Sequence, residues 1–222
     1  MLARTPEPEL MNDEDQVQAY ADADFAEAHN SLLVHLKKHL PAGQKIERIL
    51  DLGCGSGDMT YRLHRLFPAA ALHAVDGSPR MIEAARRFFA QIAMGGGAPL
   101  PVQWSCTTIQ DMPAQSYDLV FSNSLLHHIH DPSVFWKAIA GAVAPGSYVF
   151  VSDLLRPASE EEAREIVERH SGNEADILKH DFYHSLLAAF RPDEVGAQLK
   201  AAGLPLSIEI VSDRHQIIYG TV

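Results

Sequence analysis

The sequence predicts an α/β fold built on a mainly parallel sheet, and three observations support this prediction. Apolar strand-like segments alternate with segments of helical period over most of the chain, a pattern typical of crossover units. A glycine-rich turn joins the first predicted strand to the helix that follows it. Acidic residues end the first two strands, which places both acids at the carboxyl edge of a parallel sheet.

The elements follow in order from the N-terminus. Residues 1–12 contain two prolines that oppose a helix, and residues 13–40 carry an interrupted apolar face that predicts one helix capped by Asp13. Parallel strands are predicted over Ile46–Asp51, Ala71–Asp76, Val102–Cys106, Asp118–Ser122 and Ser147–Asp153. Helices are predicted over Asp58–Phe67, Pro79–Ala93 and Pro132–Ala142, and a turn over Ala144–Gly146.

The last third of the chain departs from this rhythm. Residues 154–190 read as two helical segments, the second rich in histidine and aromatic residues, and a helix follows over Pro192–Ala202. Leu206–Val211 and His215–Tyr219 read as two strands joined by a tight turn. Such a closing hairpin is expected to pair antiparallel at the edge of the sheet.

Composition limits the class of function. The formal net charge of −11 disfavours nucleic-acid and anionic-membrane partners. The two cysteines, Cys54 and Cys106, form no CxxC pair, so a structural zinc site and a disulfide framework are not expected. The N-terminus lacks the apolar region of a secretory signal, and no apolar run has the length of a membrane span. We therefore expect a cytoplasmic protein.

The loop Asp51-Leu52-Gly53-Cys54-Gly55-Ser56-Gly57 is the sharpest motif, because its glycines allow a tight turn and close approach of a ligand. Asp76 follows Asp51 by 25 positions, close to the spacing of a ribose-binding acid. A dinucleotide fingerprint would need glycine at position 58, which is Asp58. The pattern therefore favours an adenosyl ligand without phosphates over a nicotinamide dinucleotide.

With the segments that follow it, this loop resembles motif I of the class I S-adenosylmethionine-dependent methyltransferases. The further resemblances lie, in family order, at Val75–Met81, Gln110–Pro113, Tyr117–Asn123 with Leu125–Pro132, and Ala144–Ser147. The resemblance runs from about Ile46 to Asp153 and resumes at Pro192–Gly203. Each motif alone is weak, but five in the family's order are a strong indication.

The resemblance implies S-adenosyl-L-methionine as the cofactor. Asp51 would receive its ammonium group, Asp76 would hold the ribose hydroxyls, and Asn123 would lie near the methionyl group. The other implied cofactor contacts are the loop residues Gly53, Cys54, Gly55 and Gly57, the adenine contacts Gly77, Met81, Thr108 and Ile109, and Tyr20 in an N-terminal lid. Thr108 stands where the family often has an acid, and a hydroxyl bonds the adenine amino group more weakly.

Candidates for contact with the methyl acceptor lie after the later strands and in the insertion. They are His127, His128, Asp153, His180, Tyr183 and His184. His180 and His184 share one helix face at i, i+4, a spacing that suits metal ligands, a base or substrate contact, or a plain polar face. No metal site is predicted. For the first three residues, ligand contact and a structural role stay open.

Taken together, the sequence predicts one domain with a Rossmann-like, seven-stranded, mainly parallel sheet, an antiparallel last strand and helices on both faces. Its parts are a helical lid (1–42), the cofactor-binding core (43–153), a substrate cap (154–190) and a C-terminal helix with hairpin (191–222). The predicted function is methyl transfer to nitrogen, oxygen or sulfur of a small metabolite. Other S-adenosylmethionine chemistry and a non-enzymatic binding module remain alternatives, and a homodimer is one open oligomeric state.

Overall fold

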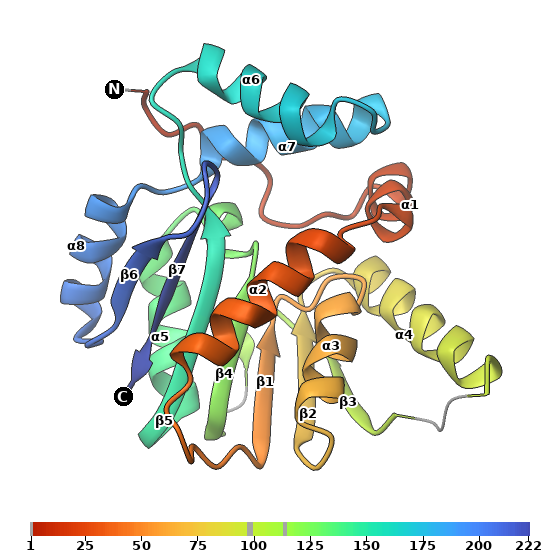
Figure 1. Ribbon diagram of the computed structural model, residues 1–222, viewed down its shortest axis with the longest axis vertical. Helices are drawn as coiled ribbons and strands as arrows, with labels where there is room; N and C mark the ends of the chain where they lie inside the picture. Colours follow the sequence, from red (N-terminus) through yellow and green to blue (C-terminus); the bar gives the residue numbers. More distant parts are fainter. Residues whose placement is uncertain (1, 97–99, 113–114) are drawn as a thin grey trace.

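The computed structural model describes residues 2–96, 100–112 and 115–222, so Pro113 of the third resemblance lies outside the described residues. Its seven strands form one sheet in the order β3-β2-β1-β4-β5-β7-β6 (Figure 1). The strands are β1 (Arg48–Leu52), β2 (Ala71–Asp76), β3 (Val102–Cys106), β4 (Tyr117–Asn123), β5 (Val143–Leu154), β6 (Ser207–Ile210) and β7 (His215–Thr221).

The direction of the strands confirms the predicted mainly parallel sheet with an antiparallel last strand. Strands β3, β2, β1, β4 and β5 pair in parallel, whereas β7 pairs antiparallel with both β5 and β6. The hairpin does not simply extend the edge, because its second strand inserts between β5 and β6. From β1 the chain adds β2 and β3 on one side, and then β4 and β5 on the other side. At such a reversal of strand order a crevice forms above the carboxyl ends of the two central strands, here β1 and β4.

Helices cover both faces of the sheet. One apolar core lies between the sheet and α5 (Pro132–Ala142) with α8 (Pro192–Ala202), centred on buried Trp136, Val120 and Val149. The opposite face is covered by α2 (Ala26–His39), α3 (Asp58–Leu66) and α4 (Pro79–Met94). Strands buried on both faces read as continuous apolar runs, and this is why β4 and β5 were recognisable in the sequence.

The single helix predicted over residues 13–40 is wrong in one respect: it is two helices. Helix α1 (Glu14–Asp22) is capped by Asp13 as expected, and α2 begins at Ala26. Between them the Asp24 carboxylate accepts a hydrogen bond from the Ala26 amide at 2.9 Å, which satisfies one of the amides that have no partner within the first turn of α2. The break lets α1 turn over the carboxyl edge of the sheet while α2 packs along its face (Figure 1).

The turn expected over Ala144–Gly146 is instead an irregularity within β5. The pairing of β4 with β5 shifts register between Tyr117 and Leu119, and Gly146 has a φ of +93°. Extra residues accommodated in this way form a bulge, which bends the strand without ending it.

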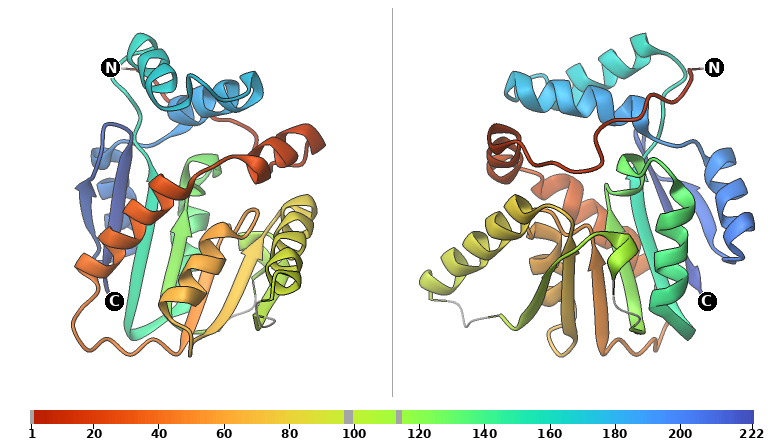
Figure 2. Two further views of the ribbon diagram at one scale, coloured as in Figure 1. Left: turned by 45° about the vertical axis from the view of Figure 1, so that its right-hand side comes forward. Right: turned by 180° about the vertical axis from the view of Figure 1, so that it is seen from behind.

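The insertion forms a cap over the carboxyl edge, as Figure 2 shows. It consists of α6 (Glu160–Ser171) and α7 (Asp176–Ala188), which enclose a small core around Ile166 and Leu186. Residues 2–12, here called the arm, run beneath this cap toward α1 (Figure 2). The Leu2 and Thr5 amides donate hydrogen bonds to the carbonyls of Ala158 and Leu187, so the arm is held against the cap although it forms no helix.

Arg4 makes the densest set of arm contacts. Its guanidinium donates to the carbonyl oxygens of Ala188 (2.6 Å), His127 (2.8 Å) and Ile129 (3.1 Å), and it lies 4.0 Å from the Phe190 ring centre.

Arg4→Ala should destabilise folding by about 2 kcal/mol, because three partly buried acceptors lose a charged donor. Urea denaturation measures this, with the solvent-exposed Arg87→Ala expected within about 0.5 kcal/mol of wild type. Equal stability of all three proteins would show that the arm contributes nothing to the fold.

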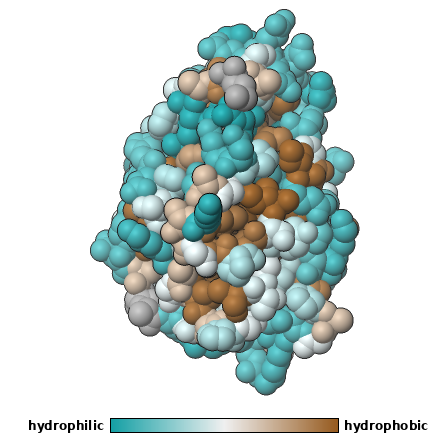
Figure 3. All heavy atoms as spheres, turned by 90° about the vertical axis from the view of Figure 1, so that its left-hand side faces the viewer, coloured by the Kyte–Doolittle hydropathy of each residue, from teal (hydrophilic) through white to brown (hydrophobic). Residues whose placement is uncertain are grey.

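Hydrophobic side chains gather in the middle of the molecular face shown in Figure 3. Val34 of α2 and Ile210 of the edge strand β6 are 64% and 57% exposed.

Within the described ranges, every helix is too short or too polar to cross a lipid bilayer.

Candidate functional site

The glycine loop leaves β1 at the point where the strand order reverses. Gly53, Gly55 and Gly57 have φ values of +77°, +52° and +90°, a region in which side chains with a Cβ are strained. The amides of Gly53 and Cys54 both bond the Val75 carbonyl, at 2.8 and 3.0 Å, which ties the loop to the end of β2. A Cβ on Gly57 would meet Ala85 at 3.0 Å, so this glycine serves the packing of α4.

Asp76 ends β2 beside this loop. Its carboxylate accepts hydrogen bonds from the Gly55 amide at 2.9 Å and the Ser78 amide at 2.8 Å. Burial raises the pKa of Asp76, and the two amide bonds oppose that rise. Both amides hold the carboxylate in one orientation, as a fixed acceptor for a ligand's hydroxyl groups requires.

Asp51 lies deeper, with 1% of its surface exposed. The Thr60 hydroxyl of α3 donates to its carboxylate at 2.5 Å. Burial raises the pKa of Asp51 to about 7, with a smaller contribution from the nearby Asp76 charge, while the Thr60 bond works in the opposite direction. A cation bound next to this carboxyl group would lower its pKa and favour the charged carboxylate, so the position suits an ammonium group.

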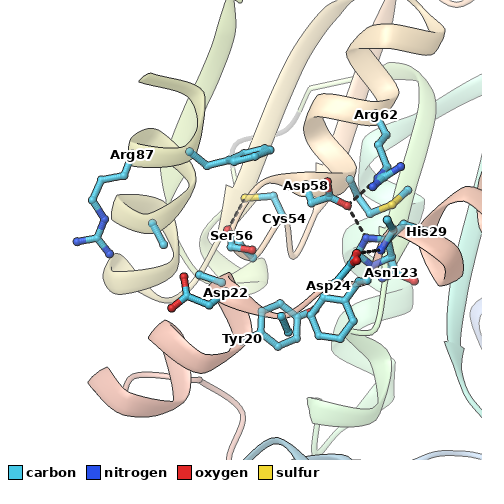
Figure 4. A pocket seen from close by; sticks show the side chains of 18 of the residues that line it. Tyr20, Asp22, Asp24, His29, Cys54, Ser56, Asp58, Arg62, Arg87 and Asn123 are labelled. Atoms are coloured by element: carbon cyan, nitrogen blue, oxygen red, sulfur yellow. Dashed lines mark hydrogen bonds and ion pairs between the residues drawn. The ribbon is translucent and has the colours of Figure 1, made fainter. Parts of the chain in front are cut away.

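A small cavity of about 250 Å³ opens beside Asp51, between the glycine loop and the break of the N-terminal helices. In Figure 4, Tyr20 closes one side of it, and Asp58 lies between His29 and Arg62 on another. Asp58 accepts from His29 at 2.5 Å and from Arg62 at 2.7 Å. These contacts link α2 to the start of α3 and hold the lid on the loop.

A larger cavity of about 1030 Å³ lies under the cap and shares Tyr20, Gly53, Gly55 and Asn123 with the small one. The two cavities therefore meet over the glycine loop. Their combined lining includes every predicted cofactor residue except Gly57, namely Tyr20, Asp51, Gly53, Cys54, Gly55, Asp76, Gly77, Met81, Thr108, Ile109 and Asn123. Thr108 bonds Asp111 through its hydroxyl at 2.9 Å, so that oxygen is already engaged as a donor.

The residues after β4 form a buried polar cluster at one wall of the large cavity. His127 is 2% exposed, and its Nδ1 lies 2.8 Å from the Asp153 carboxylate. Burial alone would lower the pKa of His127, but the carboxylates of Asp153 and Glu7 raise it. For His128, burial and the neighbouring His127 lower the pKa to about 3. His128 is thus neutral near pH 7 and a poor proton acceptor.

Asp153 lies behind these histidines. Besides His127, it accepts from the amides of Leu126 (2.7 Å) and Leu154 (2.8 Å). Among the described residues that line the large cavity are His127 and His128, but not Asp153. Its position makes it a positioning residue for the His127 ring.

The structure does not bring the insertion's predicted residues to the cavity. Among the described cavity-lining residues, α7 contributes Leu178, Asp181, Phe182 and Ser185, and the set excludes His180, Tyr183 and His184. Tyr183 turns to α6, where its hydroxyl bonds Glu160 at 3.2 Å, and His180 is largely exposed. The i, i+4 spacing identified a shared face correctly, but only packing decides which face turns inward.

Sequence reasoning missed the arm as a part of this site. Glu9, Leu10 and Met11 line the large cavity, and a Cβ on Gly77 would lie 2.7 Å from Leu10. The Ser78 hydroxyl donates to the Met11 carbonyl at 2.7 Å. No local pattern could have found these contacts, because their partners lie more than sixty positions away in the chain.

Comparison with known proteins gives related sequences and folds. Residues 49–146 match a family model described as a methyltransferase domain. The chain is 35% identical over 109 residues to malonyl-[acyl-carrier protein] O-methyltransferase of Hahella chejuensis, covering 48% of this chain and 36% of that protein. It is 28% identical over 169 residues to ubiquinone biosynthesis O-methyltransferase of Xanthomonas axonopodis pv. citri, and the match covers 75% of this chain and 64% of that protein.

The matched stretch thus spans from about a third to just under two thirds of these curated relatives. Among solved structures, a SAM-dependent methyltransferase from Aquifex aeolicus superposes with a TM-score of 0.68 at 16% identity, covering 94% of this chain and 98% of that one. This likeness confirms the fold predicted from the alternation of strands and helices.

Proposed function

We propose that the chain is a class I S-adenosylmethionine-dependent methyltransferase that transfers a methyl group from S-adenosyl-L-methionine to a small metabolite. The match to the methyltransferase-domain model, the related O-methyltransferase sequences and the shared fold support this proposal. The observation that carries the proposal is the pair of cavities that meet over the glycine loop, one beside Asp51 and the other beside Asp76. An extended ligand with a cationic end and a ribose fits such a pair.

The residues present suit that cofactor. The small cavity would take its amino-acid part, with Asp51 facing the ammonium group and the loop backbone passing beneath. The large cavity would take the adenosine, with Asp76 accepting from the ribose hydroxyls and Gly77, Met81, Thr108 and Ile109 around the adenine. Because three loop glycines carry no Cβ, the backbone can approach the ligand closely.

The part of the large cavity beneath the cap would hold the acceptor. Its wall combines apolar Leu178 and Phe182 with polar Asp181, Ser185 and His215. A mixed wall of this kind orients a small molecule through a few polar groups. The two relatives are described as O-methyltransferases, which favours an oxygen nucleophile over nitrogen or sulfur.

When bound, the cofactor would supply an electrophilic methyl group carried on a sulfonium sulfur, and that sulfur would become a neutral thioether once the methyl group is transferred. The protein's contribution is then mainly to position the acceptor and to exclude water. His128, with its low pKa, does not serve as the base in this proposal. His127 acts as a wall of the site that Asp153 holds in place.

The pKa of Asp51 predicts how cofactor binding depends on pH. Its folded-state value of about 7 lies above the usual 3.8, so below pH 7 the carboxyl must lose a proton before it pairs with an ammonium. Affinity should rise up to about tenfold per pH unit below 7 and level off above it, until the ligand's α-amino group deprotonates near pH 8. Titration calorimetry between pH 5.5 and 7.5 measures this slope, and Asp51→Asn should remove it.

The test of the proposed function has two stages. Calorimetry with S-adenosylmethionine and S-adenosylhomocysteine should show saturable binding of both. Incubation of the protein and labelled S-adenosylmethionine with a metabolite extract should then yield small products heavier by one methylene. Products that carry a different fragment would indicate other S-adenosylmethionine chemistry, and binding without turnover on any extract would indicate a binding module. No binding at millimolar ligand would refute the proposal.

A further inference from the structure

A cluster of three metal-ligand side chains lies where the arm crosses the end of β4. Glu7 belongs to the arm, whereas His127 and His128 follow β4. One ligand atom from each residue lies within 4.8 Å of the other two. The Glu7 carboxylate oxygen Oε1 is 3.4 Å from His127 Nε2 and also 3.4 Å from His128 Nδ1. The cluster is well enclosed, since the side chains are 11%, 2% and 18% exposed.

These separations do not match hydrogen bonding. A charge-assisted bond between an imidazolium and a carboxylate is normally about 2.7–2.9 Å long. At 3.4 Å, Glu7 Oε1 is buried without a hydrogen-bond partner among the described residues. A buried carboxylate oxygen without a hydrogen bond is costly, and a cation bound at this oxygen would offset that cost.

The same separations match a coordination shell. Nitrogen and oxygen ligands about 2.0–2.1 Å from a tetrahedral zinc ion lie roughly 3.3–3.4 Å from one another. The two equal distances from Glu7 are therefore those of two edges of such a tetrahedron. Two histidines and one glutamate form a zinc-ligand set that leaves a further position open.

The surroundings orient the ligands. Asp153 accepts from His127 Nδ1 at 2.8 Å, which leaves Nε2 as the free lone pair, and a carboxylate behind a ligating histidine is the usual supporting contact. Ser185 donates to the second oxygen of Glu7 at 3.2 Å, so Oε1 alone faces the histidines. The His128 Nδ1 lies 3.2 Å from the Pro8 carbonyl, and metal binding would displace the proton that it shares there.

We propose that Glu7, His127 and His128 bind a divalent metal ion of the zinc class that fastens the arm to the core. Local sequence patterns could not reveal this site, because Glu7 lies 120 positions before His127 and 121 before His128. The ion would fix the arm where Leu10 covers Gly77 and would lie behind the wall of the acceptor cavity. The inference does not depend on the proposed methyl transfer.

Metal binding to the purified full chain tests the proposal. The protein is stripped with a chelator and titrated with Zn²⁺, and with Co²⁺ as a spectroscopic probe. We expect one tightly bound equivalent, visible absorption bands typical of tetrahedral Co²⁺, and slower hydrogen exchange of the arm amides when the metal is added. Glu7→Gln should weaken binding on the order of 100-fold and abolish the metal's effect on the arm. Circular dichroism and the urea midpoint of the metal-free protein, measured separately, report whether that variant is folded.

Two controls make the outcome specific. Glu9→Gln changes a neighbouring arm acid that bonds the His130 amide and should bind metal as wild type does. His39→Gln disrupts a second possible ligand group, formed by His35, His39 and Glu209, and should also leave the tight equivalent in place. The proposal is overturned if Zn²⁺ binds no tighter than millimolar, if Glu7→Gln retains wild-type affinity, or if His39→Gln alone loses the metal.

Discussion

Asp76→Ala should reduce the affinity for S-adenosylmethionine by more than about 100-fold, which corresponds to about 3 kcal/mol. The variant removes a charged acceptor for two ribose hydroxyls, and hydrogen bonds to a charged group contribute about 1.5–3 kcal/mol each. It also removes the acceptor of the Gly55 and Ser78 amides, so the loop should lose its fixed orientation. Titration calorimetry at pH 7.5 measures the affinity.

Asp118→Ala is the matched control for this variant. Asp118 also accepts two backbone amide bonds, from Glu47 and Arg48 at 2.8 Å each, but it lies at the opposite, amino end of the sheet. The control should lose some stability and keep cofactor affinity within a few-fold of wild type. If both variants bind equally well, Asp76 is not part of the cofactor site. If both lose binding, the effect of Asp76→Ala is one of folding.

Trp136→Ala should lower the free energy of unfolding by about 3–5 kcal/mol, the range for removal of a large aromatic core side chain. Trp136, which belongs to α5, is fully buried against α8 and the sheet. Its indole N–H donates to Gln198 at 2.9 Å, so the variant also leaves a partly buried amide oxygen unpaired. Urea denaturation followed by circular dichroism measures the change.

Trp104→Ala provides the comparison within the same fold. Unlike Trp136, Trp104 lies half-buried on β3 at the edge of the sheet, with its ring centre 5.0 Å from that of Phe89. Its replacement should cost about 1–2 kcal/mol, since less apolar area leaves contact. A Trp104 effect as large as that of Trp136 would contradict the placement of the main core.

Local patterns were sufficient for most of the fold. The bounds of β2, β3, α5 and α8 agree with the predicted ones, because each element starts or ends at a strong signal. Proline stands at the first position of α5 and α8, Pro101 precedes β3, and a glycine follows β2 and α8. The break at Ala23–Phe25 was missed, because the apolar face on either side continues with nearly helical spacing.

The cofactor side of the site was also within reach of the sequence. Asp51, the glycine loop and Asp76 are local to two strand ends, and a parallel sheet brings adjacent strand ends together. The acceptor side was not. Which face of α7 turns inward depends on how α6 packs against it, and that packing turns Tyr183 toward Glu160 and away from the cavity.

The sequence alone thus determined the mainly parallel sheet with its antiparallel end, and the glycine loop and acids at two neighbouring strand ends, because these depend on short-range period, turn chemistry and the geometry common to parallel sheets. Only the tertiary structure decided the path of the arm, the inward face of the cap and the meeting of Glu7 with His127 and His128. The contacts of the arm join segments more than a hundred residues apart, and no local propensity encodes which distant side chains will share one buried volume.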